Sequence, residues 1–231
     1  MSEAAPTAVG VDARRGGWFA VVLRGRTVEG VRVRHLAELP ARIPDAAAFA
    51  VDMPLTLPDR APRAADLAAK ALLGSKHVSV FLVPPREVLE QPTHAEASAR
   101  SRELMDRGLS AQAYALRTKC LEAIAWAERT APDAAPVHEV HPEVSFTVLR
   151  GEPAASKRTW LGQQQRLEAL RSAGIVVPPD DPEAAGVAVD DVLDAAVAAW
   201  SCRRILAGEA IGLPEEPERF RDTDLPSVIL A

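Results

Sequence analysis

Short apolar runs, separated by turns and charged residues, make up the first 53 positions of the chain. Runs at 8–12 and 18–23 flank the turn Ala-Arg-Arg-Gly-Gly, and a run at 27–34 places valines among arginines that share a face at i and i+2. Such runs are typical of strands, so they predict an antiparallel meander. A helix-like segment at 35–43 ends before a proline, and an apolar run at 46–53 predicts the next strand.

The middle of the chain is rich in alanine, and its apolar residues have helical spacing. This spacing predicts helices at 64–73, 93–107 and 110–129. A short β-like run at 77–83 precedes two consecutive prolines. We therefore expect a helical insertion at about 62–132, or a cap over the sheet, within a single domain that spans residues 1–231.

The last third of the chain mixes strand-like and helix-like segments. Residues 137–141 alternate as in a strand, and the proline that follows ends this strand and can begin a helix through Leu149. Further helices are predicted at 159–172 and 189–200. A linker rich in proline and aspartate at 178–182 separates them, and a possible edge strand lies at 227–230.

Two of the predicted strands end in aspartate. The first run closes on Asp12, and the run at 46–53 contains Asp52 within Val-Asp-Met-Pro. Aspartate is depleted in strands, and ligand sites in open α/β sheets lie at the carboxyl ends of parallel strands. Both residues also begin turn-rich segments, so a purely structural role in turns stays open for each of them.

The helix predicted from 189 onward carries an acidic face. Asp190, Asp191 and Asp194 fall within one arc of it, and the apolar residues lie opposite: Val189, Val192, Leu193, Ala196, Val197 and Trp200. Like charges placed so closely destabilise a helix unless water, a cation or the helix N-terminus offsets their repulsion. A solvated first turn explains the same residues, so the rest of the chain has to decide between these interpretations.

The segment His138-Glu139-Val140-His141-Pro142-Glu143 is also unusually polar. Its composition would suit metal ligands. Its spacing is not the His-Glu-x-x-His of zinc hydrolases, which needs both histidines on one helix face, whereas this segment has strand character and a proline. A zinc hydrolase is therefore a minor alternative.

Composition narrows the class of protein. The chain has 231 residues and a net charge of −5, which argues against a protein that coats nucleic acid through a broad basic field.

Cys120 and Cys202 lie in helical patterns without metal-ligand spacing, so we expect buried free thiols. No apolar run could span a bilayer and the first residues do not resemble a signal peptide, so a cytoplasmic protein without membrane contact is expected.

The order of acids along the chain resembles that of a known superfold. An aspartate ends the first strand and another ends a later strand, a glutamate lies on a third, and Asp191-x-x-Asp194 lies on a late helix. This order resembles the ribonuclease H-like superfold, in which a three-strand antiparallel meander is followed by parallel strands, with helices on both faces of the mixed sheet. The helix segment also resembles the D-x-x-D-A segment of RuvC-type Holliday-junction resolvases.

Four segments are more specifically similar to the DUF429 family, whose members are predicted RNase H-like nucleases. The segments are Gly10-Val11-Asp12 with Gly17-Trp18, Val51-Asp52-Met53-Pro54-Leu55, the His138–Glu143 segment with Ser145-Phe146, and Asp190-Asp191-Val192-Leu193-Asp194-Ala195. The resemblance covers nearly the whole chain. It implies a fold more firmly than it implies a substrate.

A nuclease of this kind would hold a pair of Mg²⁺ or Mn²⁺ ions. Carboxylates without thiolates suit these hard cations, and two ions about 4 Å apart can activate the attacking water and stabilise the leaving 3′-oxygen of a phosphodiester. We expect Asp12 to bridge both ions, with Asp52 and Glu139 as flanking ligands and Asp191 with Asp194 completing the cage. The pattern does not decide which of Asp190, Asp191 and Asp194 faces inward.

Nearby basic residues have open roles. Lys157 is expected to contact a phosphate or act near the leaving group, or else to be a solvated loop lysine. His138 or His141 could orient a carboxylate or transfer a proton, and a structural hydrogen bond is the simpler expectation for His141. Nucleic acid is the expected substrate, without a choice among RNA, DNA, hybrid, branched junction or nucleotide. The oligomeric state is not predicted.

Two alternatives stay open. An actin-like or sugar-kinase-like ATPase shares the strand order, but the turn after Asp12 lacks the Ser or Thr of its phosphate hairpin and the chain is short for two such units. A binding or scaffold protein could have kept the acids without cutting. Several acids at the ends of apolar runs are unfavourable without a cation, which argues against this scaffold.

Overall fold

The computed structural model describes residues 5–221 and 223–231, and its contacts divide the chain into two compact units. The first unit consists of the chain up to Met53, Thr130–Ile211 and Leu230–Ala231. The second consists of Pro54–Arg129 and Gly212–Ile229. The single domain with an insertion at about 62–132 stays a prediction.

The first unit is built on a five-stranded mixed sheet with the order β3-β2-β1-β4-β5. Its strands are β1 (Thr7–Arg14), β2 (Gly17–Arg24), β3 (Thr27–Val33), β4 (Ala46–Val51) and β5 (Val137–Glu139). The first three strands form an antiparallel meander, whereas β4 pairs with β1 and with β5 in parallel. The predicted meander and parallel strands are thus confirmed.

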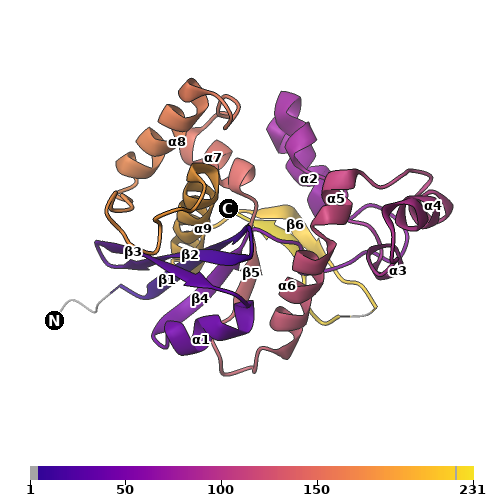
Figure 1. The fold of residues 1–231 in the computed structure, drawn as a ribbon, viewed down its shortest axis with the longest axis horizontal. Helices are drawn as coiled ribbons and strands as arrows, with labels where there is room; N and C mark the ends of the chain where they lie inside the picture. The colour runs from indigo at the N-terminus through magenta and orange to yellow at the C-terminus, as the bar shows by residue number, and fades with distance from the viewer. Residues whose placement is uncertain (1–4, 222) are drawn as a thin grey trace. The chain divides into compact units, whose positions relative to one another are not determined.

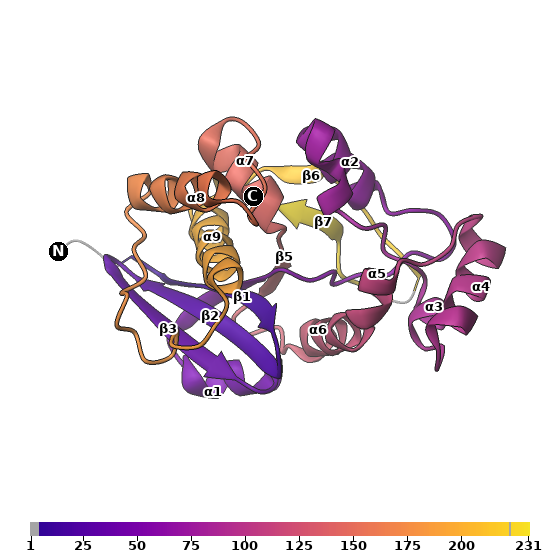
Figure 2. The ribbon, with the colours of Figure 1, turned by 45° about the horizontal axis from the view of Figure 1, so that its top comes forward.

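Helices lie on both sides of this sheet, as Figures 1 and 2 show. The short helices η1 (Leu36–Glu38) and α1 (Leu39–Arg42) follow the meander, and α1 lies on one side. The other side carries α7 (Pro142–Arg150), α8 (Trp160–Ser172) and α9 (Val189–Leu206). The expected α/β class is confirmed, because helices cover both faces of the mixed sheet. Central strands that are covered on both faces are apolar throughout.

Helix α9 packs directly on β1, and Gly10 is the reason that it can. A Cβ atom at Gly10 would lie 1.9 Å from the backbone nitrogen of Ala199 and 2.3 Å from the carbonyl oxygen of Ala195. A glycine within a strand often marks such a close approach of another backbone. The helix is therefore seated against the strand that carries Asp12.

The burial of α9 differs from the expected two-sided pattern. From Leu193 to Cys202 every residue of the helix is buried, including Asp194. Val189, which was expected on the apolar face, is instead half exposed, so that part of the prediction is wrong. The first turn of α9 precedes the part that is enclosed by the sheet and by neighbouring helices.

Hydrogen bonds connect α9 to α7 and to β4 within the first unit. The hydroxyl of Ser201 on α9 donates to that of Ser145 on α7 across 2.8 Å, and the thiol of Cys202 donates to the carbonyl of Ala48. Both cysteines of the chain are free and buried, as predicted. The chain end returns to this unit, where Leu230 forms a parallel bridge with Val140.

The second unit is mainly helical. Its elements are α2 (Ala64–Leu73), η2 (Gly74–Ser79), α3 (Arg86–Leu89), α4 (His94–Met105), α5 (Ala111–Ala115), α6 (Arg117–Arg129), β6 (Gly212–Glu218) and most of β7 (Ser227–Leu230). A buried ion pair organises its first part, with Nη2 of Arg63 2.5 Å from Oδ1 of Asp66. The other carboxylate oxygen of Asp66 accepts a hydrogen bond from the backbone of Val83.

Two predictions fail in the second unit, and one of its strands was not predicted. The run at 77–83 is not a strand, because η2 extends to Ser79 and Val78 is almost fully exposed. The helix predicted at 110–129 is interrupted at Leu116. Strand β6 was not predicted, because Pro214 and Pro217 argue against a strand within a sheet; β6 pairs with β7 in a separate two-stranded sheet. The expected strand at 227–230 is confirmed.

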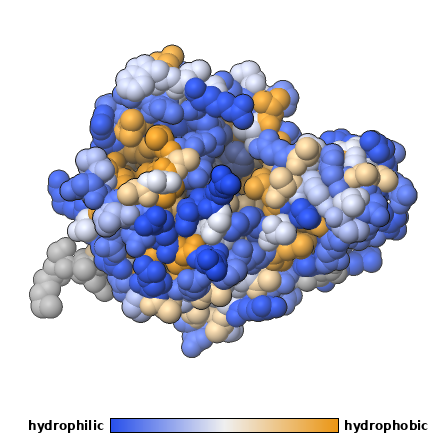
Figure 3. Space-filling model, in the orientation of Figure 1, coloured by the Kyte–Doolittle hydropathy of each residue, from blue (hydrophilic) through white to orange (hydrophobic). Residues whose placement is uncertain are grey.

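Charged residues make up 26% of the sequence, and the face drawn in Figure 3 is accordingly mostly hydrophilic with small apolar patches. Among the described residues no helix is long and apolar enough to cross a membrane.

Candidate functional site

The sheet register brings together three of the predicted acids. Asp12 lies near the end of β1, and the backbone of Asp52, just after β4, donates a hydrogen bond to the carbonyl of Val11 across 2.9 Å. Glu139 ends β5 and pairs with Val51, the residue before Asp52. Because parallel strands end at the same edge of a sheet, Asp12, Asp52 and Glu139 follow one another along that edge.

Helix α9, which packs on one face of the sheet, carries the remaining predicted acids. Gly10 and Asp12 share one face of β1 because side chains alternate along a strand, and Gly10 contacts α9 at Ala195. The neighbouring Asp194 is 3% exposed. Asp191 lies about one turn earlier, and its charge contributes to the raised pKa of Asp12. The close packing at Gly10 therefore also sets the distance between the acids of the sheet and those of the helix.

Burial and mutual repulsion make these carboxyls hard to ionise. Burial, followed by the charges of Asp52 and Asp194, raises the pKa of Asp12 well above its usual range. Burial raises the pKa of Asp52 to about 7 despite a hydrogen bond from the Asp12 carboxyl, and burial likewise raises the pKa of Asp194 to about 7. Burial and the neighbouring carboxylates thus favour the protonated forms of these acids when no cation is bound.

The helix acids are not equivalent. Asp191 is partly buried, and burial followed by the nearby charge of Asp190 raises its pKa. Asp190 keeps 43% of its side chain exposed and lies 3.6 Å from the Nζ atom of Lys157. The sequence left the inward-facing acid undecided; in the structure Asp194 is the buried one, Asp191 is intermediate and Asp190 lies at the rim.

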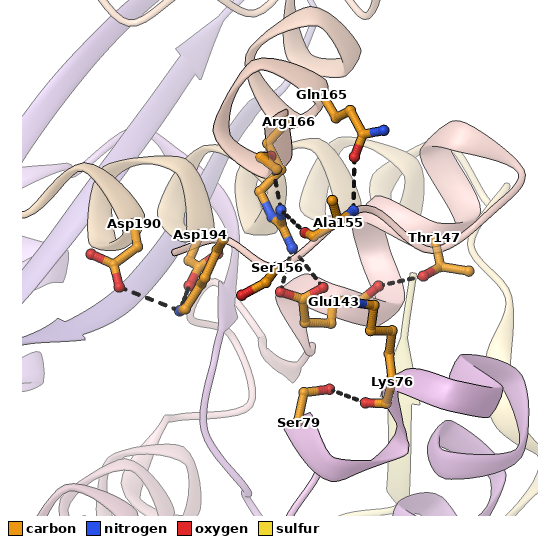
Figure 4. Close-up of polar contacts among 12 residues, drawn as sticks. Lys76, Ser79, Glu143, Thr147, Ala155, Ser156, Gln165, Arg166, Asp190 and Asp194 are labelled. Atoms are coloured by element: carbon orange, nitrogen blue, oxygen red, sulfur yellow. Dashed lines mark hydrogen bonds and ion pairs between the residues drawn. The ribbon is translucent and has the colours of Figure 1, made fainter. Parts of the chain in front are cut away.

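Lys157 reaches this cluster from the segment before α8. Its Nζ atom donates to Oδ2 of Asp194 across 2.6 Å, and Figure 4 shows Asp190 and Asp194, the two acids that this ammonium contacts, on α9. Burial disfavours the charged ammonium, but the attraction of Asp194 outweighs this and the pKa of Lys157 is raised. Lys157 is therefore a charged partner of the acids rather than a solvated loop lysine.

One oxygen of the cluster lacks a partner. Oδ1 of Asp194 is buried and, among the residues that the structure describes, accepts no hydrogen bond. A buried acceptor of this kind is unfavourable unless a ligand or cation completes it. The charged groups that act on Asp194 are the ammonium of Lys157 and the carboxylates of Asp52 and Glu143, and carboxylate oxygens suit Mg²⁺ or Mn²⁺.

The side chains are nevertheless not arranged as in a loaded metal site. Within the described part of the chain, no three His, Cys, Asp or Glu side chains are grouped so that they could hold a metal ion as they stand. The buried Oδ1 of Asp194 nevertheless accepts no hydrogen bond among the described residues, and a cation is one way to complete it. The carboxylate oxygens of the cluster are the kind of ligand that a hard cation prefers.

Arg166, which the sequence did not single out, and Glu143 of the polar segment hold Lys157 in place. Arg166 on α8 is 1% exposed, and its Nη2 atom donates to both carboxylate oxygens of Glu143 on α7, at 2.6 and 2.8 Å. Its Nη1 atom donates to the carbonyls of Ala155 and Gly162, at 2.8 and 2.9 Å. Arg166 thus joins α7, α8 and the segment that leads to Lys157 (Figure 4).

Gly162 permits the close packing of this segment on α8. A Cβ atom there would lie 2.0 Å from the carbonyl oxygen of Ser156, the residue before Lys157. The side chain of Gln165 accepts a hydrogen bond from the backbone of Ala155, and Thr159 caps α8 by accepting from Gly162. The backbone on both sides of Lys157 is therefore anchored to α8.

The two histidines of the polar segment occupy different positions. His138 lies within β5, and burial lowers its pKa, so the neutral imidazole is favoured. His141 is the residue before α7, and its carbonyl accepts a hydrogen bond from the backbone of Ser145. A role for either side chain in orienting a carboxylate or moving a proton stays a prediction.

Comparison with known proteins adds one finding. A family model described as a protein of unknown function, DUF429, matches residues 10–219. The chain belongs to the DUF429 family. The family assignment that rests on four short segments is therefore confirmed, and the DUF429 match includes all the acids described above together with Lys157 and Arg166. No curated protein and no solved structure shows significant similarity to the chain.

Proposed function

We propose that this DUF429 protein is a metal-dependent phosphodiester hydrolase that acts on nucleic acid. The observation that carries the proposal is the cluster of buried Asp12, buried Asp194 and partly buried Asp52, with an unpaired oxygen on Asp194. Clusters of acids with strongly shifted pKa values are more frequent at functional sites than elsewhere.

The charges of the cluster support a cation there. When Asp12, Asp52 and Asp194 are all ionised, Lys157 neutralises one charge and leaves a net negative charge in the cluster. Such a charge is highly unfavourable in a medium of low polarity unless protons or cations compensate it. A divalent cation would do so while the carboxylates stay ionised at neutral pH.

Asp12, Asp52 and Asp194 would hold the ions, with Glu139 and Asp191 as flanking ligands. Bound Mg²⁺ or Mn²⁺ would supply Lewis-acid stabilisation of the phosphodiester and lower the pKa of the attacking water. Lys157 holds Asp194 in position and places a positive charge beside the acids. The Arg166–Glu143 pair fixes the backbone from which Lys157 extends.

A scaffold protein without catalysis is the second candidate, and one observation favours it. The pKa values of Asp52 and Asp194 lie at about 7, so protons alone can neutralise much of the cluster near neutral pH. In that case neither Mg²⁺ nor Mn²⁺ would stabilise the protein. A ligand that binds only the folded state would raise its stability.

The proposal is tested by incubating the protein with labelled single-stranded, duplex, hybrid and branched nucleic acids in Mg²⁺ or Mn²⁺. Asp12→Asn should abolish cutting, whereas Asp180→Asn, at an exposed aspartate of the same unit, should cut like the wild type. Metal-dependent cutting that Asp12→Asn leaves unchanged would point to a contaminant and contradict the proposal. So would the absence of cutting in every substrate.

A further inference from the structure

Two large apolar side chains are exposed beside Lys157. Trp160 is 76% exposed and Leu161 is 59% exposed, at the start of α8. Burying them on folding would have been favourable, because a Trp side chain carries a large apolar area. Their exposure therefore suggests that they contact something other than the chain's own core.

The backbone that carries Trp160 is held firmly. Its segment is packed on α8 through Gly162, anchored by Arg166, and capped by Thr159. Trp160 is only three residues from Lys157, whose ammonium touches the acid cluster. The backbone of Trp160 is thus already anchored three residues from the lysine that touches the cluster, so binding would need no reorganisation of this backbone.

One basic residue lies next to Lys157 in the sequence, and another lies near the acid cluster in space. Arg158 is exposed next to Lys157. Arg14, at the end of β1, lies close enough to Asp191 to influence its pKa, although burial and Asp190 have larger effects. The protein as a whole carries a net charge of −5, so basic residues at the rim of an acidic cluster are a local feature. They complement a phosphate backbone that passes the cluster.

We propose that Trp160 stacks on an unpaired base of a nucleic-acid strand whose phosphates contact Arg158. This inference rests on the proposed function and narrows its substrate to nucleic acid with unpaired nucleotides. An indole face can stack only on a base whose own face is free, and the bases inside a duplex already stack on each other. Leu161 extends the apolar surface beside the indole.

The test measures binding without metal, so that no cleavage is needed. A short labelled single-stranded oligonucleotide and its blunt duplex are titrated with the full chain in a chelating buffer, and binding is followed by fluorescence anisotropy. The wild type should bind the single strand more tightly than the duplex. Trp160→Ala should weaken single-strand binding by about fivefold or more, since stacking on one base contributes about 1–3 kcal/mol.

Matched variants separate stacking from other causes. Trp160→Phe should keep most of the affinity and Trp160→Leu should lose it, because only an aromatic ring stacks. Val176→Ala, at another exposed apolar residue of the same unit, should bind like the wild type. Arg158→Gln should reduce the slope of log affinity against log salt by about 0.7.

Several outcomes would overturn the inference: no single-strand binding by the wild type, equal binding by wild type and Trp160→Ala, or equal binding by Trp160→Phe and Trp160→Leu. A wild-type dimer that becomes monomeric in Trp160→Ala would assign the surface to a second copy of the chain instead. Cutting that persists in Trp160→Ala with unchanged binding contradicts this inference alone. Stacking without any metal-dependent cutting contradicts the proposed function alone.

Discussion

Lys157 and Asp194 join two segments of the chain across 2.6 Å, the distance from Nζ to Oδ2. Lys157 comes from the segment before α8 and Asp194 from the buried part of α9. The pair leaves Oδ1 of Asp194 without a partner among the described residues, so a second positive charge can bind the same carboxylate. The site therefore combines one fixed cation, the Lys157 ammonium, with a carboxylate oxygen that is still unpaired.

Removing Lys157 should leave Asp194 as an uncompensated buried acid. In Lys157→Met we expect the pKa of Asp194 to rise further above about 7, because burial already raises it and the attraction of the ammonium is lost. The pKa can be followed by NMR of the Asp194 carboxyl carbon in metal-free protein. A pKa that stays the same or falls in the variant would show that the pair does not control Asp194.

The raised pKa values also predict how stability depends on pH without metal. For Asp194 the folded pKa is about 7 and the reference value is 3.8, so the folded state binds more protons between these values. Its contribution to the free energy of unfolding is present below about pH 4 and is lost as the pH rises through about 7.

Urea unfolding in chelator between about pH 5 and pH 8 measures this effect. Asp194→Asn removes the titrating group, so its stability should fall less steeply with pH than that of the wild type. Parallel pH profiles for the two proteins would be evidence that Asp194 ionises normally in the folded state.

Gly10→Ala tests whether the packing of α9 on β1 positions the acids. The new Cβ would meet backbone atoms of Ala195 and Ala199, which cannot move aside as a side chain would. We expect a loss of about 3 kcal/mol in the free energy of unfolding and weaker metal binding.

Gly16→Ala is the matched control for this substitution. It has no neighbour near the added Cβ, and its positive φ of 79° should destabilise the protein by only about 1 kcal/mol. An equal loss of stability in the two variants would contradict the account of the packing at Gly10.

The ion pair of buried Arg166 with partly buried Glu143 predicts strong coupling. Glu143→Gln alone should cost about 3 kcal/mol or more, because it leaves the buried guanidinium uncompensated, and Arg166→Met should cost somewhat less, because Glu143 keeps 16% of its side chain exposed. The double variant should lose clearly less than the sum, with a coupling free energy of about 1–3 kcal/mol. Additive losses in urea unfolding would mean that the two side chains act independently.

Much of the site could be predicted from the sequence because it depends on local patterns. Asp12 and Asp52 end apolar strands, and parallel strands end at a common edge, so their proximity follows from the strand order. The Asp191-x-x-Asp194 spacing places both acids on one side of a helix.

The supporting residues could not be predicted, because they depend on contacts between distant elements. Arg166 has the spacing of an ordinary helix residue, and only the packing of α8 on α7 reveals that it is buried against Glu143. Val189 and the run at 77–83 were assigned from apolar character alone, which does not tell whether a neighbouring element covers a residue.

Calorimetric titration of metal-free protein with Mn²⁺ tests the central claim most directly. The account predicts that the wild type and Asp180→Asn bind two ions per chain, whereas Asp12→Asn and Asp194→Asn bind far more weakly or with fewer ions. Binding should release protons near neutral pH, because the metal displaces them from Asp12, Asp52 and Asp194. No binding by the wild type, or equal binding by Asp12→Asn, would contradict the claim that the buried carboxylates form a metal site.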